Sequence, residues 1–450
     1  MNRKLILVLA LAIAAALPAK ALGAGDLEYE FGEGGKVITP VPLHQPWSRT
    51  HVQLAGAPDG AMLVAGDERV LRYAPGGQLD ASFGRGGVLQ IALPGVAGFE
   101  IADLEVDSEG RIILIGTAVV GALRGSGGTS AAILRYLPDG EPDTSFGGDG
   151  LVIAHLGLRG AGGVTASQGA IDGQNRIILV AGTAQRTSSC GSAPRLAYRD
   201  RLIARFTPSG TLDPSFGRHG TQTIEPLQKV SAMSLDGSGV VLAGKPLGAC
   251  GGPETGVIRL RPDGSQVLDF GRRGTRTLTG SVAAIAVDRR ERVVFLFKEK
   301  QKVRPLDEHV TKLVRLLPDG RRDPSFAGNG LVVYEFQGPL YKWTSLLIDP
   351  EGRLLAVGTL VRPLPKKKQR GGLLYHRWLM VWPLQESGAQ QGGFGWLGWL
   401  SITRFNSRSD AAASEAVIDE DGELLVAGTT REPHRAPHGG FALARFELWH

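Results

Sequence analysis

"LDPSFGRHG", residues 212–220, is the stretch that decides the fold, because the chain repeats it. Close copies are "LDASFGRGG" at 79–87 and "PDTSFGGDG" at 142–150, and weaker copies occur at 267–274 and 322–330. Counting two short forms, "FGEGG" and "FGWLG", the Phe of the phrase falls at residues 31, 83, 146, 216, 270, 326 and 394. A period of about 50 to 70 residues with variable inserts is typical of a repeat array or a propeller.

The order of segments within each period predicts four short strands. A strand enters a tight turn, as in "LEVDSEGR" at 104–111, and a second apolar strand follows at once. After a variable loop, a third strand such as "AAILRY" (131–136) leads through a PDG turn and the Phe-Gly phrase into a fourth. Four strands of this length with Asp/Gly turns form one antiparallel sheet. A sheet that is apolar on both faces must stack on neighbours, radially as a propeller or linearly as a solenoid.

The chain ends favour the propeller. The chain finishes with "GGFALARFELWH", a third strand without its turn phrase, and residues 26–40, "DLEYEFGEGGKVITP", supply a turn phrase and a fourth strand. Together they complete one repeat. The sequence therefore predicts an all-β fold, a seven-bladed β-propeller of four-stranded antiparallel blades, in which the strand near Lys36–Thr39 pairs with the strand ending Ala442–Phe446.

The motif "RY-x-PDG-x-LD-x-SFG-x-x-G", seen best at 134–150 and 205–220, resembles the delta-60 repeats of exported bacterial β-propeller proteins. The resemblance covers nearly the whole chain after residue 23 and is degraded at 258–274 and 381–398. It implies a fold and no shared catalytic residues.

Composition indicates an exported protein. Residues 1–23 combine Arg3 and Lys4 with an apolar run of 13 residues, Leu5–Leu17, and a small-residue end, which predicts a signal peptide cleaved after Ala21 or Gly23. No later segment approaches about 18 uninterrupted apolar residues, so we expect a soluble periplasmic or extracellular domain over residues 24–450. Removing Arg3, Lys4 and Lys20 lowers the formal charge from +6 to +3. This balance gives no reason to expect a nucleic-acid partner, and we expect a monomer.

The repeated charges indicate structure. An Arg in the third strand is followed eight residues later by an Asp, and Arg445 with Glu28 continues the pattern across the split repeat. Val381 and Gln391 lack both charges, whereas Arg259 faces Val267 and breaks the rule. The presence or absence of both charges together predicts a partly buried ion pair. Removing one partner of such a pair leaves the other charge buried and unpaired, which costs about 3–5 kcal/mol of stability. The repeated members are Arg72–Asp80, Arg135–Asp143, Arg205–Asp213 and Arg315–Asp323. The phrase's glycines predict positive φ, and its Phe rings should pack between blades.

No motif for a catalytic centre, metal or cofactor is evident. HExxH, GxSxG and Walker A patterns are absent, and no dinucleotide-binding fingerprint occurs with its flanking strand and helix. "IDEDGE" at 418–423 is explained better by a hairpin turn than by a calcium loop, and the histidines at 434 and 438 flank a proline.

Two basic segments in the variable loops are candidate anion-binding sites. One carries Lys298, Lys300, Lys302 and Arg304, and the other carries Lys366, Lys367, Lys368 and Arg370. The alternatives are solvated loops, or a rim that binds anionic glycans, lipid head groups or other polyanions, with nearby Trp and Tyr residues stacking on sugars.

The two cysteines, Cys190 and Cys250, each follow the second strand of neighbouring repeats. Equivalent loops emerge on one face, and an exported protein meets oxidising conditions, so we predict a Cys190–Cys250 disulfide.

Three functional classes stay open. The first is a binding or scaffolding module at the bacterial cell envelope, and the second is a propeller enzyme of lyase or lactonase type with a site at the central channel. The third is an inert spacer. The predicted innermost strands, for example 284–287 and 346–348, are apolar and small, which favours binding. Titratable side chains at the channel would favour the enzyme.

Overall fold

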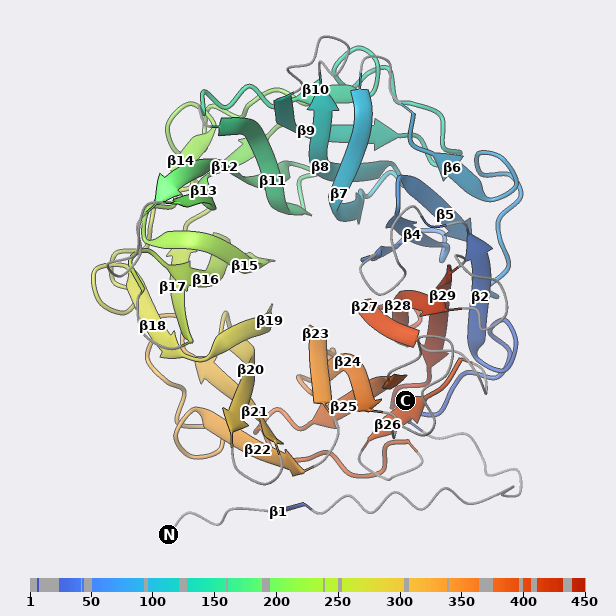
Figure 1. The fold of residues 1–450 in the computed structure, drawn as a ribbon, viewed down its shortest axis with the longest axis vertical. Helices are drawn as coiled ribbons and strands as arrows, with labels where there is room; N and C mark the ends of the chain where they lie inside the picture. The colour runs from blue at the N-terminus through green and yellow to red at the C-terminus, as the bar shows by residue number, and fades with distance from the viewer. Residues whose placement is uncertain are drawn as a thin grey trace.

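The computed structural model is all-β in the residues that it describes. These are residues 6–7, 24–41, 43, 51–92, 96–120, 128–158, 161–187, 195–237, 239–249, 253–302, 307–337, 340–363, 375–395, 400–405, 411–431 and 439–449. Their strands form antiparallel sheets of four, arranged side by side around a common axis (Figure 1). A single residue pair, Gly163–Thr129, joins two of these sheets into an eight-stranded one. Among the described residues, no helix is long and apolar enough to cross a membrane.

The strands of each sheet run outward from the axis in sequence order, except that β2, from the start of the chain, lies outside β29. The innermost strands are β3 (Gln53–Gly56), β7 (Val96–Val106), β11 (Ala161–Ile171), β15 (Leu227–Asp236), β19 (Ser281–Val287), β23 (Leu340–Ile348) and β27 (Ala411–Ile418). The second strands are β4 (Met62–Gly66), β8 (Ile112–Val120), β12 (Ile177–Thr187), β16 (Gly239–Pro246), β20 (Val293–Lys302), β24 (Leu354–Pro363) and β28 (Leu424–Arg431).

The outer strands complete the sheets. The third strands are β5 (Arg69–Tyr73), β9 (Gly128–Tyr136), β13 (Arg195–Phe206), β17 (Glu254–Leu260), β21 (Asp307–Leu316), β25 (Tyr375–Leu384) and β29 (Gly439–Phe446). The fourth strands are β6 (Val88–Gln90), β10 (Leu151–Ile153), β14 (Thr221–Thr223), β18 (Thr275–Thr279), β22 (Leu331–Gln337), β26 (Ser401–Thr403) and β2 (Lys36–Val41). In addition, β1 (Ile6–Leu7), within the predicted signal peptide, pairs in parallel with β22.

The core lies between neighbouring sheets, which is why the second strands are continuous apolar runs. In β8, Ile112 and Leu114 pack toward the β3–β6 sheet, whereas Ile113 and Ile115 pack toward the β11–β14 sheet. Alternate residues of a strand point to opposite faces, so a strand buried on both faces needs an apolar residue at every position.

The Phe of the repeated phrase packs against the next sheet, as predicted. Phe83 is fully buried, and a Cβ placed on Gly140 would lie 2.9 Å from its ring. Gly140 has φ +93°, and the Gly84 amide donates to the Asp139 carbonyl at 3.0 Å. Glycine is therefore required at this turn twice over, by its backbone conformation and by the close approach of the ring.

Both chain ends build the last turn. In the turn that follows β9, the Leu137 amide donates to Glu141 O. In the corresponding turn after β29, the Glu447 amide donates to Asp26 O at 3.0 Å. The Gly395 amide donates to Ala24 O at 2.7 Å, in the way that Gly84 contacts Asp139. β2 then pairs antiparallel with β29, with Lys36 opposite Ala444 and Thr39 opposite Phe441, the pairing predicted from the sequence.

Candidate functional site

The predicted ion pairs of the repeats are confirmed. Arg135 Nε lies 2.7 Å from Asp143 Oδ2, and both side chains are almost fully buried. Arg445 pairs with Glu28 at 3.0 Å across the two chain ends. The remaining pairs are Arg72–Asp80 at 3.4 Å, Arg205–Asp213 at 2.8 Å and Arg315–Asp323 at 2.7 Å.

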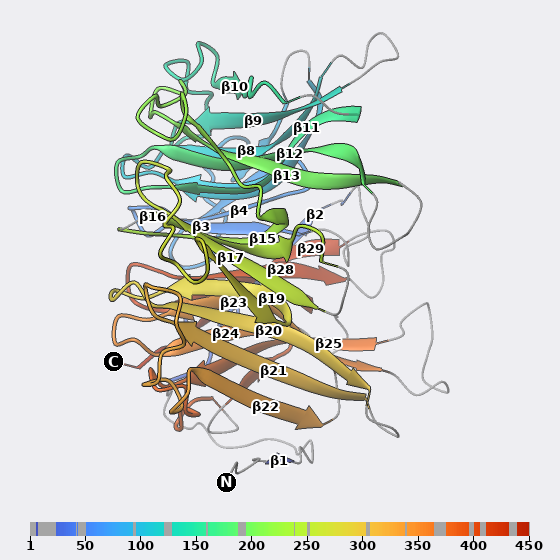
Figure 2. The ribbon, with the colours of Figure 1, turned by 90° about the vertical axis from the view of Figure 1, so that its left-hand side faces the viewer.

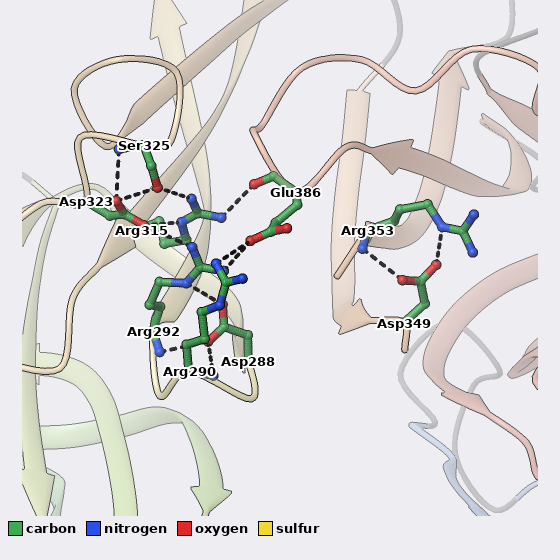
Figure 3. Close-up of polar contacts among 9 residues, drawn as sticks. All are labelled: Asp288, Arg290, Arg292, Arg315, Asp323, Ser325, Asp349, Arg353 and Glu386. Carbon is green, nitrogen blue, oxygen red and sulfur yellow. Dashed lines mark hydrogen bonds and ion pairs between the residues drawn. The ribbon is translucent and has the colours of Figure 1, made fainter. Parts of the chain in front are cut away.

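These arginines also hold the next sheet in place. Arg315 Nη1 donates to Glu386 O at 2.6 Å, and its Nη2 donates to Ser325 Oγ at 2.9 Å (Figure 3). Its guanidinium also lies 4.7 Å from the centre of the Phe326 ring. Arg135 and Arg205 make the same contacts to the carbonyl oxygens of Pro208 and Pro262. With every polar edge of the guanidinium engaged inside the protein, the repeated motif is structural and offers no position for a ligand.

The exceptions to the pattern have physical explanations. Val381 is fully buried in the apolar core, so the missing arginine of its repeat leaves no buried charge. Arg259, which has Val267 where other repeats have Asp, finds Asp236 at 2.7 Å and Glu291 at 3.1 Å instead. "IDEDGE" forms the turn between β27 and β28, as predicted, and Arg445 contacts Asp419 and Asp421 there.

A small pocket of about 140 Å³ lies between two of the inner hairpin turns, Asp288–Arg292 and Asp349–Arg353. Its wall includes Arg290 and Glu386, which lie 3.4 Å apart, and Arg292 binds Glu386 at 2.5 Å (Figure 3). Positive and negative charges are paired across this wall, so it favours neither a cationic nor an anionic ligand.

The innermost strands carry a group of polar residues that the sequence analysis missed. Six of these strands have a register shift in their pairing with the second strand, and in each the residue after the shift faces the same position of the second strand. In β3, Gln53 faces the corresponding residue of β4, Ala65. At this position four consecutive sheets have Glu415, Gln53, Asp103 and Gln168, and we call these residues the polar arc. The other sheets have Ala232, Ala284 and Ser345 there. One side of the axis is therefore polar and the other consists of small side chains.

The polar arc links successive sheets. Glu415 Oε2 accepts from the Leu54 amide at 2.9 Å, and Gln53 Nε2 donates to Ala102 O at 2.6 Å. Asp103 Oδ2 accepts from the Gly169 amide at 3.3 Å. All four side chains are half-buried.

The carboxyl groups of the arc hold protons more tightly than usual. Burial raises the pKa of Asp103 to about 7 and that of Glu415 to about 8, and repulsion from Asp103 adds to the shift of Glu415. Glu105, two residues beyond Asp103, has a strongly raised pKa from burial and from repulsion by both carboxylates. Groups that titrate near neutral pH are suited to proton transfer or to binding a cation. In the described part of the chain, no three His, Cys, Asp or Glu side chains are grouped to hold a metal ion.

The segments interpreted as apolar, such as 284–287 and 346–348, are apolar, but Asp103 of β7 and Glu415 of β27 lie outside the segments that the sequence analysis considered. The sequence did contain a signal for the polar arc. Each arc residue faces the fourth residue of the second strand, so aligning the hairpins on their turns would have found the position.

The predicted anion-binding residues are only partly described. Lys298 is exposed on β20, opposite Thr311, and Lys300 and Lys302 follow on the same strand. Lys366, Lys367, Lys368 and Arg370, together with Arg304, lie outside the described residues. The same holds for Cys190, Cys250 and the two histidines at 434 and 438.

Two of the aromatic residues proposed to stack on sugars are buried. Trp378 is 6% exposed and Trp382 is 1% exposed. Both pack in the core shared by the β19–β22 and β23–β26 sheets.

Comparison with protein families supports a β-propeller repeat family. A family model described as "Domain of unknown function (DUF5122) beta-propeller" matches residues 57–83, 108–146 and 175–216. The matched segments contain the first-hairpin and turn-phrase regions of three successive sheets. A comparison with curated proteins found no match.

Solved structures resemble the chain at low identity. A protein of unknown function from Dyadobacter fermentans is 12% identical, with 92% of this chain and 99% of that chain covered and a TM-score of 0.39. Extracellular domains 1–2 of Drosophila semaphorin 1b are 10% identical over 95% and 88% of the chains, with a TM-score of 0.43. A gluconolactonase from Xanthomonas campestris is 14% identical over 76% and 95%, with a TM-score of 0.34.

Proposed function

We propose that this protein is an exported, seven-bladed β-propeller with delta-60-like repeats, closed by the β2–β29 pairing, that acts as a binding or scaffolding module at the bacterial cell envelope. The proposed ligand is an anionic glycan or a similar polyanion. The module is the mature chain from about residue 24, located in the periplasm or outside the cell.

The observation that carries the proposal is the charge of one sheet. Residues 354–409 contain eight Lys and Arg residues and a single acid, Glu386. Glu386 is engaged with Arg292 at 2.5 Å, at the end of β25 away from the basic loop. Cations therefore greatly outnumber acids in this segment of the chain, and a dense cationic surface attracts polyanions.

Salt-dependent retention tests this function. The mature protein should bind immobilised heparin or a uronic-acid polysaccharide at low salt and elute steeply as salt rises. A variant with Ser at positions 366, 367, 368 and 370 should elute earlier. No retention at low salt, or retention that salt does not change, would refute the polyanion proposal.

A second candidate function is catalysis at the central channel, and the polar arc favours it. A carboxyl group with a pKa near 7 can act as an acid or a base at neutral pH, as a lyase or lactonase requires. If the protein turns over a lactone or uronic-acid glycan, Asp103→Asn should abolish the turnover while binding persists. Turnover that survives in Asp103→Asn and in Glu415→Gln would exclude the arc as the site.

A further inference from the structure

Lys298 of β20 and Arg362 of β24 lie on facing surfaces of neighbouring sheets. On β20, Val294 and Leu296 belong to the core shared with the β23–β26 sheet, and Lys298 continues the same alternation. On β24, Leu360 belongs to that same core, and Arg362 is the next residue on its face. Because side chains alternate with a period of two, Lys298 and Arg362 project from opposing faces into the same region between the sheets.

Printed contacts show that these faces are in touch. Thr311 lies directly opposite Lys298 in the β20–β21 hairpin, and its Oγ1 accepts from Trp343 Nε1 of β23 at 2.9 Å. This hydrogen bond spans the two sheets immediately beside Lys298. The ends of both hairpins emerge on one side of the disc (Figure 2).

Further basic residues extend this surface across the sheet. His376 lies directly opposite Arg362, and its ring stacks on Trp378 with centroids 5.7 Å apart. The Arg404 guanidinium also lies over the Trp378 ring, 5.2 Å from its centre. Lys298, Arg362, His376 and Arg404 are all exposed, and we call them the basic surface.

None of the residues that directly neighbour Lys298 and Arg362 on these facing surfaces is acidic, and Asp307 lies farther along the hairpin, opposite Lys302. The neighbours on the same faces are Thr311, Tyr334, Tyr341, Trp343, Leu360, Trp378 and Ile402. In the sequence, Lys300 and Lys302 follow Lys298 at two-residue intervals, and further Lys and Arg residues follow β24 at 366–370.

We propose that the basic surface binds a linear acidic polysaccharide, laid across the β20–β21 and β24–β25 hairpins with its carboxylate or sulfate groups on Lys298, Arg362, His376 and Arg404. This inference rests on the proposed function and assigns its binding residues. The cations are spread over two sheets, which suits a chain with regularly spaced charges. Binding of single-stranded nucleic acid depends on exposed aromatic faces, and Trp378 is covered by His376 and Arg404.

The test compares two charge-matched double variants of the mature protein. Lys298→Gln/Arg362→Gln removes two cations from the basic surface. Arg85→Gln/Arg218→Gln removes two exposed cations from turn phrases of other sheets. Affinity for polygalacturonate and for heparin is measured by calorimetry between 50 and 300 mM salt. The first variant should lose about tenfold in affinity, and its plot of log K against log salt should flatten by about 1.4, two contacts at about 0.7 each. The second should match the wild type.

The outcomes are distinguishable. Equal loss in both variants, or no loss in either, with wild-type binding intact would overturn the basic surface and leave the proposed function standing. Absence of wild-type binding to any polyanion would overturn both. Tighter binding to a thymidine oligomer than to either glycan would overturn the polysaccharide assignment.

Discussion

The buried ion pair Arg135–Asp143 should show strong thermodynamic coupling. Arg135→Leu leaves the Asp143 carboxylate almost fully buried without its cation, and Asp143→Asn leaves the guanidinium without its anion. Each single variant should lower the free energy of unfolding by about 3–5 kcal/mol. The double variant removes both charges together, as Val381 and Gln391 do naturally, so it should cost about 3 kcal/mol less than the sum of the singles.

Denaturant unfolding at pH 7, followed by tryptophan fluorescence, measures these values. Arg321 and Asp319 give a matched control, because they also lie 2.6 Å apart but their side chains are 78% and 43% exposed. Their removal should change stability by less than about 1 kcal/mol. If the losses at Arg135 and Asp143 simply add to within about 0.5 kcal/mol, the buried-pair explanation of the repeat is refuted.

The same pair has a defined pH dependence. Burial alone would raise the pKa of Asp143, but the hydrogen bonds from Ser145 and the charge of Arg135 outweigh it and lower the pKa below the usual value of 3.8. A lowered pKa means that the pair stabilises the fold above about pH 4, and that this stabilisation is lost as pH falls through the folded-state pKa. The stability difference between wild type and the double variant should therefore shrink in acid.

Three further predictions follow from the fold and the arc. Deleting residues 24–40 removes β2 and half of the turn shared by the chain ends. The melting temperature should therefore fall far more than it does when an ordinary terminus is trimmed. An unchanged melting temperature would refute a stabilising role for the β2–β29 pairing. Glu415→Gln keeps an acceptor for the Leu54 amide and removes the carboxyl group whose pKa is raised in the folded state. Ionisation of that carboxyl group destabilises the fold as pH rises from about 4.5 to about 8. The variant should therefore be more stable than wild type at pH 8.5 and equal to it at pH 4. Mass spectrometry of unreduced exported protein should detect a Cys190–Cys250 cross-linked peptide, and two freely alkylated thiols would contradict the predicted disulfide.

The repeated part of the molecule could be predicted from the sequence because its rules are local. A tight turn fixes the spacing between the third strand and the phrase that follows, so Arg and Asp eight residues apart must meet, as Arg205 and Asp213 do at 2.8 Å. The intervals between the repeated Phe residues likewise give the number of residues from one sheet to the next. Where the pattern failed, as at Arg259, one partner, Asp236, comes from the first hairpin of the same sheet and the other, Glu291, from the neighbouring sheet. Neither lies at the repeated spacing of eight residues.

The candidate sites could not be predicted in the same way, because they depend on register and on faces. Asp103 and Glu415 reach equivalent places only after a register shift in each innermost strand, and a shift of one residue moves a side chain to the other face. Lys298 and Arg362 are 64 residues apart in the chain, and only the packing of Leu296 and Leu360 in one core shows that their surfaces oppose each other.

The β23–β26 sheet departs from the repeat in its interior as well as on its surface. It lacks the buried ion pair of the other repeats, and aromatic rings pack in its interior. Trp382 lies 4.6 Å from Tyr334 and 5.7 Å from Trp343, and Phe394 lies 4.8 Å from Trp449 at the other end of the chain. Aromatic pairs stabilise without needing a charged partner in the next sheet. The interior of this sheet is therefore rich in aromatic contacts, and in its sequence cations outnumber acids. Because this sheet lacks the common ion pair and carries an excess of cations in its sequence, a ligand-binding role distinct from the scaffold is best sought there.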